Sequence, residues 1–211
     1  MTFMLYITAV FSMLYMAISG TAMAGTIVGS AHDLRSFNFS NQICVTCHTP
    51  HRADTAVTDA PLWNHALTTQ SFTPYSSATL DATDISSPTG ISRLCLSCHD
   101  GSVALDSFGG ATGTVNIPAG ANIGGDDLTN DHPISFTYDA NLVAADGALH
   151  PLATAVTIGN TGDDSRDGTL EETMLIGGQV ECASCHDVHN KFTTGATGEP
   201  LLKVSMSGSQ L

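Results

Sequence analysis

Residues 92–99 read Ser-Arg-Leu-Cys-Leu-Ser-Cys-His, and the last five of them follow a pattern that occurs three times in the chain. Two cysteines stand three positions apart, and a histidine follows the second at once. The three copies of the pattern are Cys44-Val45-Thr46-Cys47-His48, Cys95-Leu96-Ser97-Cys98-His99 and Cys182-Ala183-Ser184-Cys185-His186. Since the chain has six cysteines, this pattern contains all of them. What the pattern binds therefore decides how the chain folds.

C-x-x-C-H is the attachment motif of c-type haem. The two thiols can form thioethers with the two vinyl groups of one porphyrin, and the histidine then faces the iron as its proximal ligand. Structural disulfides would not require a histidine after each pair. Zinc also binds such pairs, but three pairs do not divide evenly into four-ligand sites. We therefore expect three haem c groups. Their attachment residues would be Cys44, Cys47, Cys95, Cys98, Cys182 and Cys185, and their proximal ligands His48, His99 and His186.

The composition favours a core that is not built from side chains. Lys and Arg number 6 against 20 Asp and Glu, a net charge of −14, which would repel nucleic acid and anionic membrane surfaces. Only 6% of the residues are aromatic. We expect a mostly irregular chain with short helices and few short strands, wrapped around haems that form the core of a multihaem cytochrome c. Short strands are predicted at residues 103–105 and 155–158, and the fold should depend on the cofactor.

Residues 1–24 form an apolar run that ends in Ala22-Met23-Ala24. A small-x-small ending is typical of a signal-peptide cleavage site. The run is also long enough to span a bilayer, and no Lys or Arg precedes it, so a retained anchor is the alternative. We expect a cleaved signal and a secreted protein of the periplasm, outer surface or extracellular space, with no membrane span after cleavage.

The chain also contains an internal repeat, which we divide into residues 25–125 and 126–211. Each copy has a leading histidine, the motif C-x-x-C-H-x-x-H, Pro-Leu, and Ser-x-Leu. In the first copy, Ser92-Arg93-Leu94 leads into a second C-x-x-C-H, whereas Ser209-Gln210-Leu211 ends the chain. We expect the sequence to be cut before a fourth motif, which would bind a fourth haem. The alternative is a three-haem protein.

Six histidines remain after the three proximal ones. Two copies with two haems each would need four distal ligands, and the repeat supplies His32, His51, His132 and His189. A second imidazole makes the iron six-coordinate, which suits electron transfer. The role of His65 stays open because the second copy has Lys203 nearby, and His150 is expected to be structural or exposed. The sequence does not fix which distal histidine serves which iron.

These motifs together resemble a known class of protein. The segments AHDL, CVTCHTPH, APLWNH, SRLCLSCHDG, NDHPISF and ECASCHDVHN are similar to exported multihaem c-type cytochromes of metal-respiring bacteria with doubled C-x-x-C-H units. Tetrahaem members include extracellular filament-forming cytochromes, or nanowires. The resemblance covers residues 27–211. It implies two histidines on each iron, stacked haems and, in a filament, a distal histidine supplied by a neighbouring subunit. The chain departs from the tetrahaem pattern because it lacks a fourth motif.

The function we expect is electron transfer between closely spaced bis-histidine haems, without enzymatic activity. The partners would be redox proteins or extracellular electron acceptors, or further copies of the chain in a homopolymer. The alternative is a multihaem reductase of a small oxyanion, which needs one iron with an open position. The chain has enough histidines to close every iron, and its negative charge would repel an oxyanion.

Overall fold

A computed structural model describes residues 27–38, 40–58, 60–158, 167–189 and 201–204. The expected leader, residues 1–24, and the closing Ser209-Gln210-Leu211 lie outside these ranges. Short elements are separated by long irregular stretches. In chain order they are η1 (Leu34–Phe37), α2 (Gly90–His99), η2 (Ala119–Ala121), β1 (Phe136–Thr137), α3 (Ala140–Asp146), β2 (Ala155–Val156), β3 (Gly168–Thr169), α4 (Leu170–Met174), β4 (Gln179–Val180) and α5 (Cys182–Cys185).

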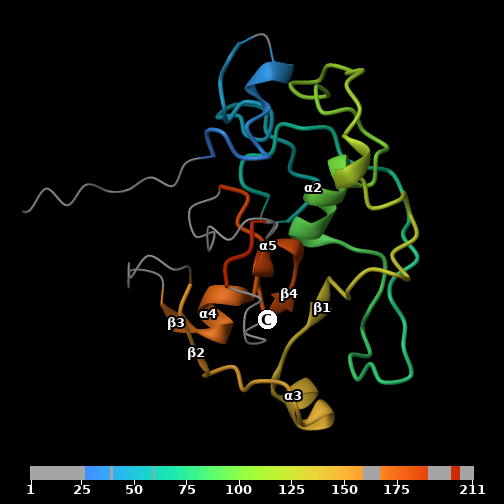
Figure 1. The fold of residues 1–211 in the computed structure, drawn as a ribbon, viewed down its shortest axis with the longest axis vertical. Coiled ribbons are helices and arrows are strands. Elements are labelled where there is room, and N and C mark those ends of the chain that lie inside the picture. The colour runs from blue at the N-terminus through green and yellow to red at the C-terminus, as the bar shows by residue number, and fades with distance from the viewer. Residues whose placement is uncertain (1–26, 39, 59, 159–166, 190–200, 205–211) are drawn as a thin grey trace, which may run out of the picture.

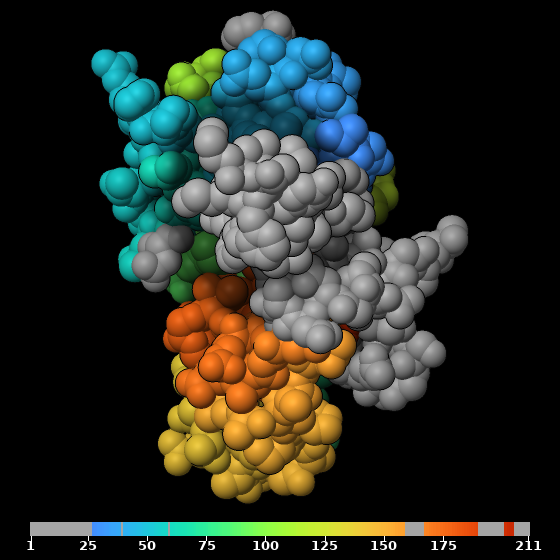
Figure 2. All heavy atoms as spheres, turned by 90° about the vertical axis from the view of Figure 1, so that its left-hand side faces the viewer, coloured from blue at the N-terminus to red at the C-terminus, as the bar shows by residue number. Residues whose placement is uncertain are grey.

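The chain runs along the long axis of the molecule to α3 and then returns to the middle, where α4, β4 and α5 lie (Figure 1). The segment with η1 lies at one end and α3 at the other, with α2 and α5 between them. Figure 2 shows the same separation on the surface, with the blue N-terminal part opposite the yellow and orange part. The second and third cysteine motifs therefore meet in the middle of the molecule, where α2 contacts α5.

The strands are two residues long and form two separate antiparallel pairs. In one pair Phe136 is opposite Val180, and in the other Ala155 is opposite Thr169. The prediction of a strand at 155–158 is confirmed for its first two residues, whereas that at 103–105 is wrong, because this stretch is irregular. Its last residue, Leu105, is 4% exposed and bonds through its N–H to the carbonyl of Val115. A short apolar run can thus be buried without joining a ladder.

The side-chain core is small. One buried cluster consists of Phe72, Leu96 and Leu128, and the other of Tyr138, Leu142 and Leu175. The most completely buried side chains of the described residues are mainly hydroxyl-bearing: His65, Thr46, Thr68, Ser92, Ser97 and Ser184. Large apolar side chains normally dominate protein interiors. The described chain therefore buries little apolar bulk at its most enclosed positions.

Helix α2 contains the whole second cysteine motif. It starts at Gly90, whose φ of +53° favours glycine. A Cβ at this position would also lie 2.8 Å from Glu181 Oε1. The helix ends at His99, where the N–H of Asp100 bonds to the carbonyl of Leu96. None of the helices in the described part of the chain has the length and apolar character needed to cross a bilayer.

Candidate metal centre

The first cysteine motif lies in a turn and the third in helix α5, and the two have matching backbone hydrogen bonds. His48 N–H bonds to Cys44 O over 2.8 Å, and His186 N–H bonds to Cys182 O over 3.0 Å. Each of the two motifs is followed in the sequence by a Pro-Leu pair, and Leu62 and Leu201 have φ of +53° and +55°.

Each returning segment pairs with its own motif. Thr49 N–H bonds to Leu62 O and Asp187 N–H to Leu201 O. In the same way, Asn64 N–H bonds to Cys47 O and Lys203 N–H to Cys185 O. The sequence similarity around Pro-Leu therefore corresponds to a shared local structure, although the domain boundaries remain a prediction.

The tautomers of His48 and His99 follow from their hydrogen bonds. His48 Nδ1 lies 2.6 Å from Pro61 O, and His99 Nδ1 lies 2.8 Å from Ala121 O. A carbonyl oxygen only accepts hydrogen bonds, so each Nδ1 carries the proton and donates it. The other nitrogen, Nε2, then has a free lone pair, as in a metal-ligating histidine whose Nδ1–H bonds to a carbonyl.

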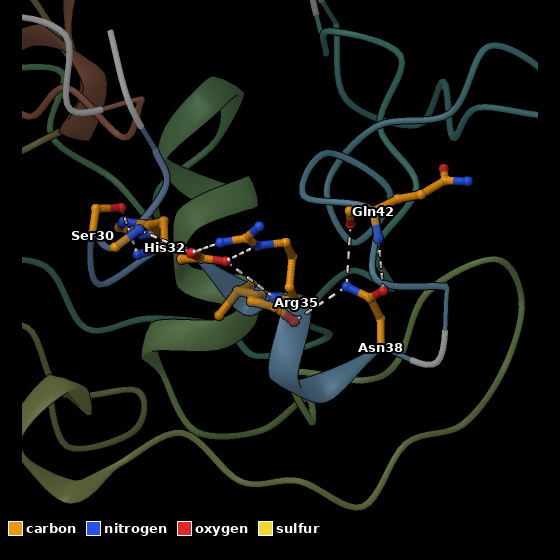
Figure 3. A network of polar contacts seen from close by, with 8 residues as sticks. Ser30, His32, Arg35, Asn38 and Gln42 are labelled. Atoms are coloured by element: carbon orange, nitrogen blue, oxygen red, sulfur yellow. Dashed lines mark hydrogen bonds and ion pairs between the residues drawn. The ribbon is translucent and has the colours of Figure 1, made fainter.

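The leading histidine of the first copy lies against the motif histidine of α2. The ring centroids of His32 and His99 are 6.1 Å apart, with 53° between their planes. The backbone N–H of His32 bonds to Ser30 Oγ, at the start of a network that includes the Asp33–Arg35 ion pair (Figure 3). Nearby, Asn38 Nδ2 donates to the carbonyls of Leu34 and Gln42. This network fixes the segment that presents His32.

Burial keeps His32 neutral near pH 7. The pKa of His32 falls from 6.5 to about 4, first because of desolvation and then because of the nearby imidazoles of His99, His189 and His186. Its Nδ1 is buried and has no hydrogen-bond partner among the described residues. An unpaired buried nitrogen costs roughly 1–3 kcal/mol, which a bond to a metal would offset.

A second histidine pair joins the two copies of the repeat. The ring centroids of His48 and His189 are 6.2 Å apart, and their planes differ by 27°. His189 is therefore brought to the motif histidine of the first copy, although it follows the third motif in the sequence. Its backbone N–H bonds to Asp187 Oδ1 over 3.1 Å, which shapes the turn that carries it.

The cysteine thiols gather between the motifs. Burial raises the pKa of Cys47 to about 11 and that of Cys98 to about 12, while desolvation raises that of Cys185 less strongly. The thiol of Cys95 donates a hydrogen bond to Cys182, which raises the pKa of Cys95 and lowers that of Cys182. At neutral pH most of these groups are therefore protonated thiols rather than thiolates.

A buried carboxylate that sequence reasoning missed connects the second and third motifs. Glu181 is 2% exposed. Its Oε2 accepts hydrogen bonds from Ser92 N at 3.0 Å, from Ser92 Oγ, and from Ser135 Oγ at 3.0 Å. Ser92 Oγ in turn accepts from Cys182 N at 2.9 Å. The sequence signal was weak because a charged residue before a cysteine is usually solvated.

His65 occupies a packing position next to the second motif. It is 2% exposed, and its Nδ1 and Nε2 lie 2.9 Å and 3.0 Å from the carbonyls of Ala66 and Ala104. Cys98 Sγ is 3.6 Å from Nε2. Asn64 and Lys203 occupy equivalent positions in the two segments. The residue equivalent to His65 is therefore Val204, which is 6% exposed. The structure therefore gives His65 a place in the core beside a cysteine.

The other predicted ligands are not brought together in the same way. His51 and His132 are exposed, as is His189, and His150, which was expected to be structural or exposed, is exposed. Among the described residues, neither His51 nor His132 has its ring against a motif histidine. Two of the four expected distal ligands, His32 and His189, thus lie beside motif histidines.

The donor set fits haem better than a free metal ion. No group of three or more His, Cys, Asp or Glu side chains within the described ranges could hold a metal ion by itself. Haem iron needs only two protein ligands, because the porphyrin supplies the other four. Two metal–nitrogen bonds of roughly 2 Å in line, plus the two ring radii, separate imidazole centroids by roughly 6 Å. The orphaned His32 nitrogen and the small core agree with such a group.

Comparisons with known proteins add no family assignment. No protein-family model matches the chain, and no curated protein sequence matches it significantly.

Proposed function

We propose that the protein is an exported multihaem c-type cytochrome that carries electrons between closely spaced haems with two histidine ligands each, and that it has no enzymatic activity. The observation that carries this proposal is the pairing of His32 with His99 and of His48 with His189 at about the separation that two axial imidazoles require. The resemblance to multihaem cytochromes of metal-respiring bacteria points to extracellular electron transfer.

The residues have separate roles in this proposal. Each cysteine pair would hold one porphyrin through thioethers, and the histidine after it would be the proximal ligand. When bound, haem supplies an iron that changes between the ferric and ferrous states. The carbonyls of Pro61 and Ala121 hold His48 and His99 in the tautomer that presents Nε2. A second imidazole closes an iron to small substrates, which favours transfer over reduction of an oxyanion.

The homopolymer is a further part of the proposal. Both His51 and its repeat counterpart His189 are exposed, but among the described residues only His189 has its ring beside a motif histidine, that of the other copy. An exposed imidazole at this position would be available as the distal ligand of a haem iron whose proximal ligand is a motif histidine in a second copy of the chain. Head-to-tail contacts of this kind generate open filaments. If so, His51→Ala should leave monomers that no longer assemble, measured by sedimentation and negative-stain electron microscopy.

The test of the main proposal starts from the full chain made in cells that attach haem c. Mass spectrometry after removal of free haem should show one covalently bound porphyrin for each cysteine pair. The ferric protein should be low-spin by absorption and EPR spectroscopy. A stable protein that carries no porphyrin would refute the proposal, and a substantial high-spin ferric signal would favour the oxyanion reductase.

A further inference from the structure

The structure carries an assignment that the sequence leaves open. We propose that His189, from the second copy of the repeat, supplies the distal ligand to the iron of the first motif, opposite His48. His51, which is nearest to that motif in the sequence, does not. This inference rests on the proposed function, since it names a ligand of the same site.

The contact geometry distinguishes the two candidates. The rings of His48 and His189 have centroids 6.2 Å apart and planes only 27° apart. Two imidazoles that bind one metal ion from opposite sides do so through nitrogens in their ring planes, and their centroids are then about this far apart. An edge-on contact would turn the planes by much more, as for His48 and Trp63 at 84°.

The hydrogen bonds of His48 orient its ring for this partner. Its Nδ1 is committed to Pro61 O, so its free lone pair is on Nε2. The turn that holds Pro61 is fixed by the bond from Thr49 N–H to Leu62 O. On the other side, Asp187 Oδ1 accepts from the N–H of His189 and holds the second turn.

His51 is held away from this role by its own turn. Thr49 Oγ1 donates to His51 O over 2.8 Å and accepts from His51 N–H over 3.3 Å. This closes a tight loop directly after the motif, and among the described residues the ring of His51 lies against no motif histidine. A consequence of the assignment is that the two copies of the repeat interlock, because the first iron is held from both.

The experiment uses the full holoprotein and its His189→Ala variant. The pair with planes 27° apart should give a rhombic low-spin ferric EPR signal, and the pair at 53° a more axial one. His189→Ala should keep every haem by mass, lose the rhombic signal and gain one high-spin haem. Added imidazole should restore the low-spin state. His150→Ala, at an exposed histidine outside the repeat pattern, is the matched control and should leave the spectrum unchanged.

A second background shows which iron is affected. In a chain with Cys44→Ala and Cys47→Ala, the first haem cannot attach, so adding His189→Ala should create no new high-spin haem. If His189 served the third motif instead, a new high-spin haem would appear and the assignment would be wrong. Loss of the rhombic signal in His51→Ala, with its retention in His189→Ala, would also overturn it. The haem count of the unaltered chain tests the proposed function separately.

Discussion

The first and third cysteine motifs share backbone hydrogen bonds but have different surroundings. Both close with the same hydrogen bonds and a leucine at positive φ. Next to the third motif stands the buried carboxylate of Glu181, where the first motif has the half-buried Ile43. A repeated turn can therefore keep its chain path while its anchors change. The turn positions the cysteines and the histidine, and the neighbours decide what holds the turn in place.

The largest expected effect comes from removing the anchor that only the third motif has. In Glu181→Ala, Ser92 N–H and the hydroxyls of Ser92 and Ser135 lose their buried acceptor. Unsatisfied buried donors cost about 1–3 kcal/mol each, so we expect a loss of at least 3 kcal/mol in the free energy of unfolding. Urea unfolding monitored by circular dichroism measures it.

The matched control is Ile43→Ala in the first copy, which removes apolar contact but no hydrogen bond and should cost about 1–2 kcal/mol. Equal losses in the two variants would show that the carboxylate is not a special anchor. Glu181→Gln keeps the shape and one carbonyl acceptor, so its loss should fall between those of the two alanine variants.

The next effect concerns the leading histidines, and it depends on pH. The folded-state pKa of His32 is about 4 against 6.5 in the unfolded chain, so the unfolded state binds more protons between these values. As far as His32 is concerned, the free energy of unfolding is highest above pH 6.5 and decreases as the pH falls towards 4. The total decrease is roughly 3 kcal/mol. An iron–imidazole bond would steepen the same trend, because protonation competes with it.

Unfolding free energies at pH 7, 5.5 and 4.5 test this expectation. The slope over this window should be smaller in His32→Gln than in the unaltered chain. His132→Gln replaces the exposed leading histidine of the second copy and should change stability at pH 7 by no more than about 0.5 kcal/mol. An unchanged slope in His32→Gln would contradict the burial of this imidazole.

A smaller effect should follow from exchanging the core residues of the two turns. His65→Val places the residue type of position 204 in the first copy. It removes the one ring N–H of the neutral imidazole, which donates either to the carbonyl of Ala66 or to that of Ala104. We expect a cost of about 1 kcal/mol and no change in the spin state of any haem. The reverse change, Val204→His, should cost more, because it adds a polar ring to an apolar site. A new high-spin haem in His65→Val would make His65 a ligand.

The smallest effect is expected at the two leucines with positive φ. An L-residue in this conformation costs about 1–2 kcal/mol, and glycine avoids most of that cost. Leu62 is 57% exposed, so Leu62→Gly loses little packing and should raise stability by a few tenths of a kcal/mol, up to about 1. Leu201 is half-buried, so Leu201→Gly should gain less. Thermal unfolding of both variants gives the comparison, and a larger gain at position 201 would contradict it.

The sequence predicted the local features better than the long-range contacts. Gly177 and Gly178 form a turn with φ values of +59° and +81°, a feature set by neighbouring residues alone. The Pro-Leu similarity indicated matching segments, which have matching bonds in the structure. Turns of this kind are set by residues near one another in the chain.

The histidine pairs could not be derived from the sequence. His48 and His189 belong to different copies, and spacing alone would favour His51, which is three residues from His48. The burial of Glu181 could not be predicted for a similar reason, because its partners Ser92 and Ser135 lie far from it in the chain. Such contacts depend on how the long irregular segments fold back, and no hydrophobic period records that path.

The small hydroxyl side chains at the centre of the molecule have a calorimetric consequence. The heat capacity of unfolding rises with the apolar surface that becomes exposed, and typical proteins show about 12–15 cal/mol/K per residue. With Thr46, Thr68, Ser92, Ser97 and Ser184 among its most enclosed side chains, the bare polypeptide should show an increment below that range. The free energy of unfolding should therefore curve less with temperature, and a strongly curved dependence should arise only when large apolar rings are enclosed with the chain.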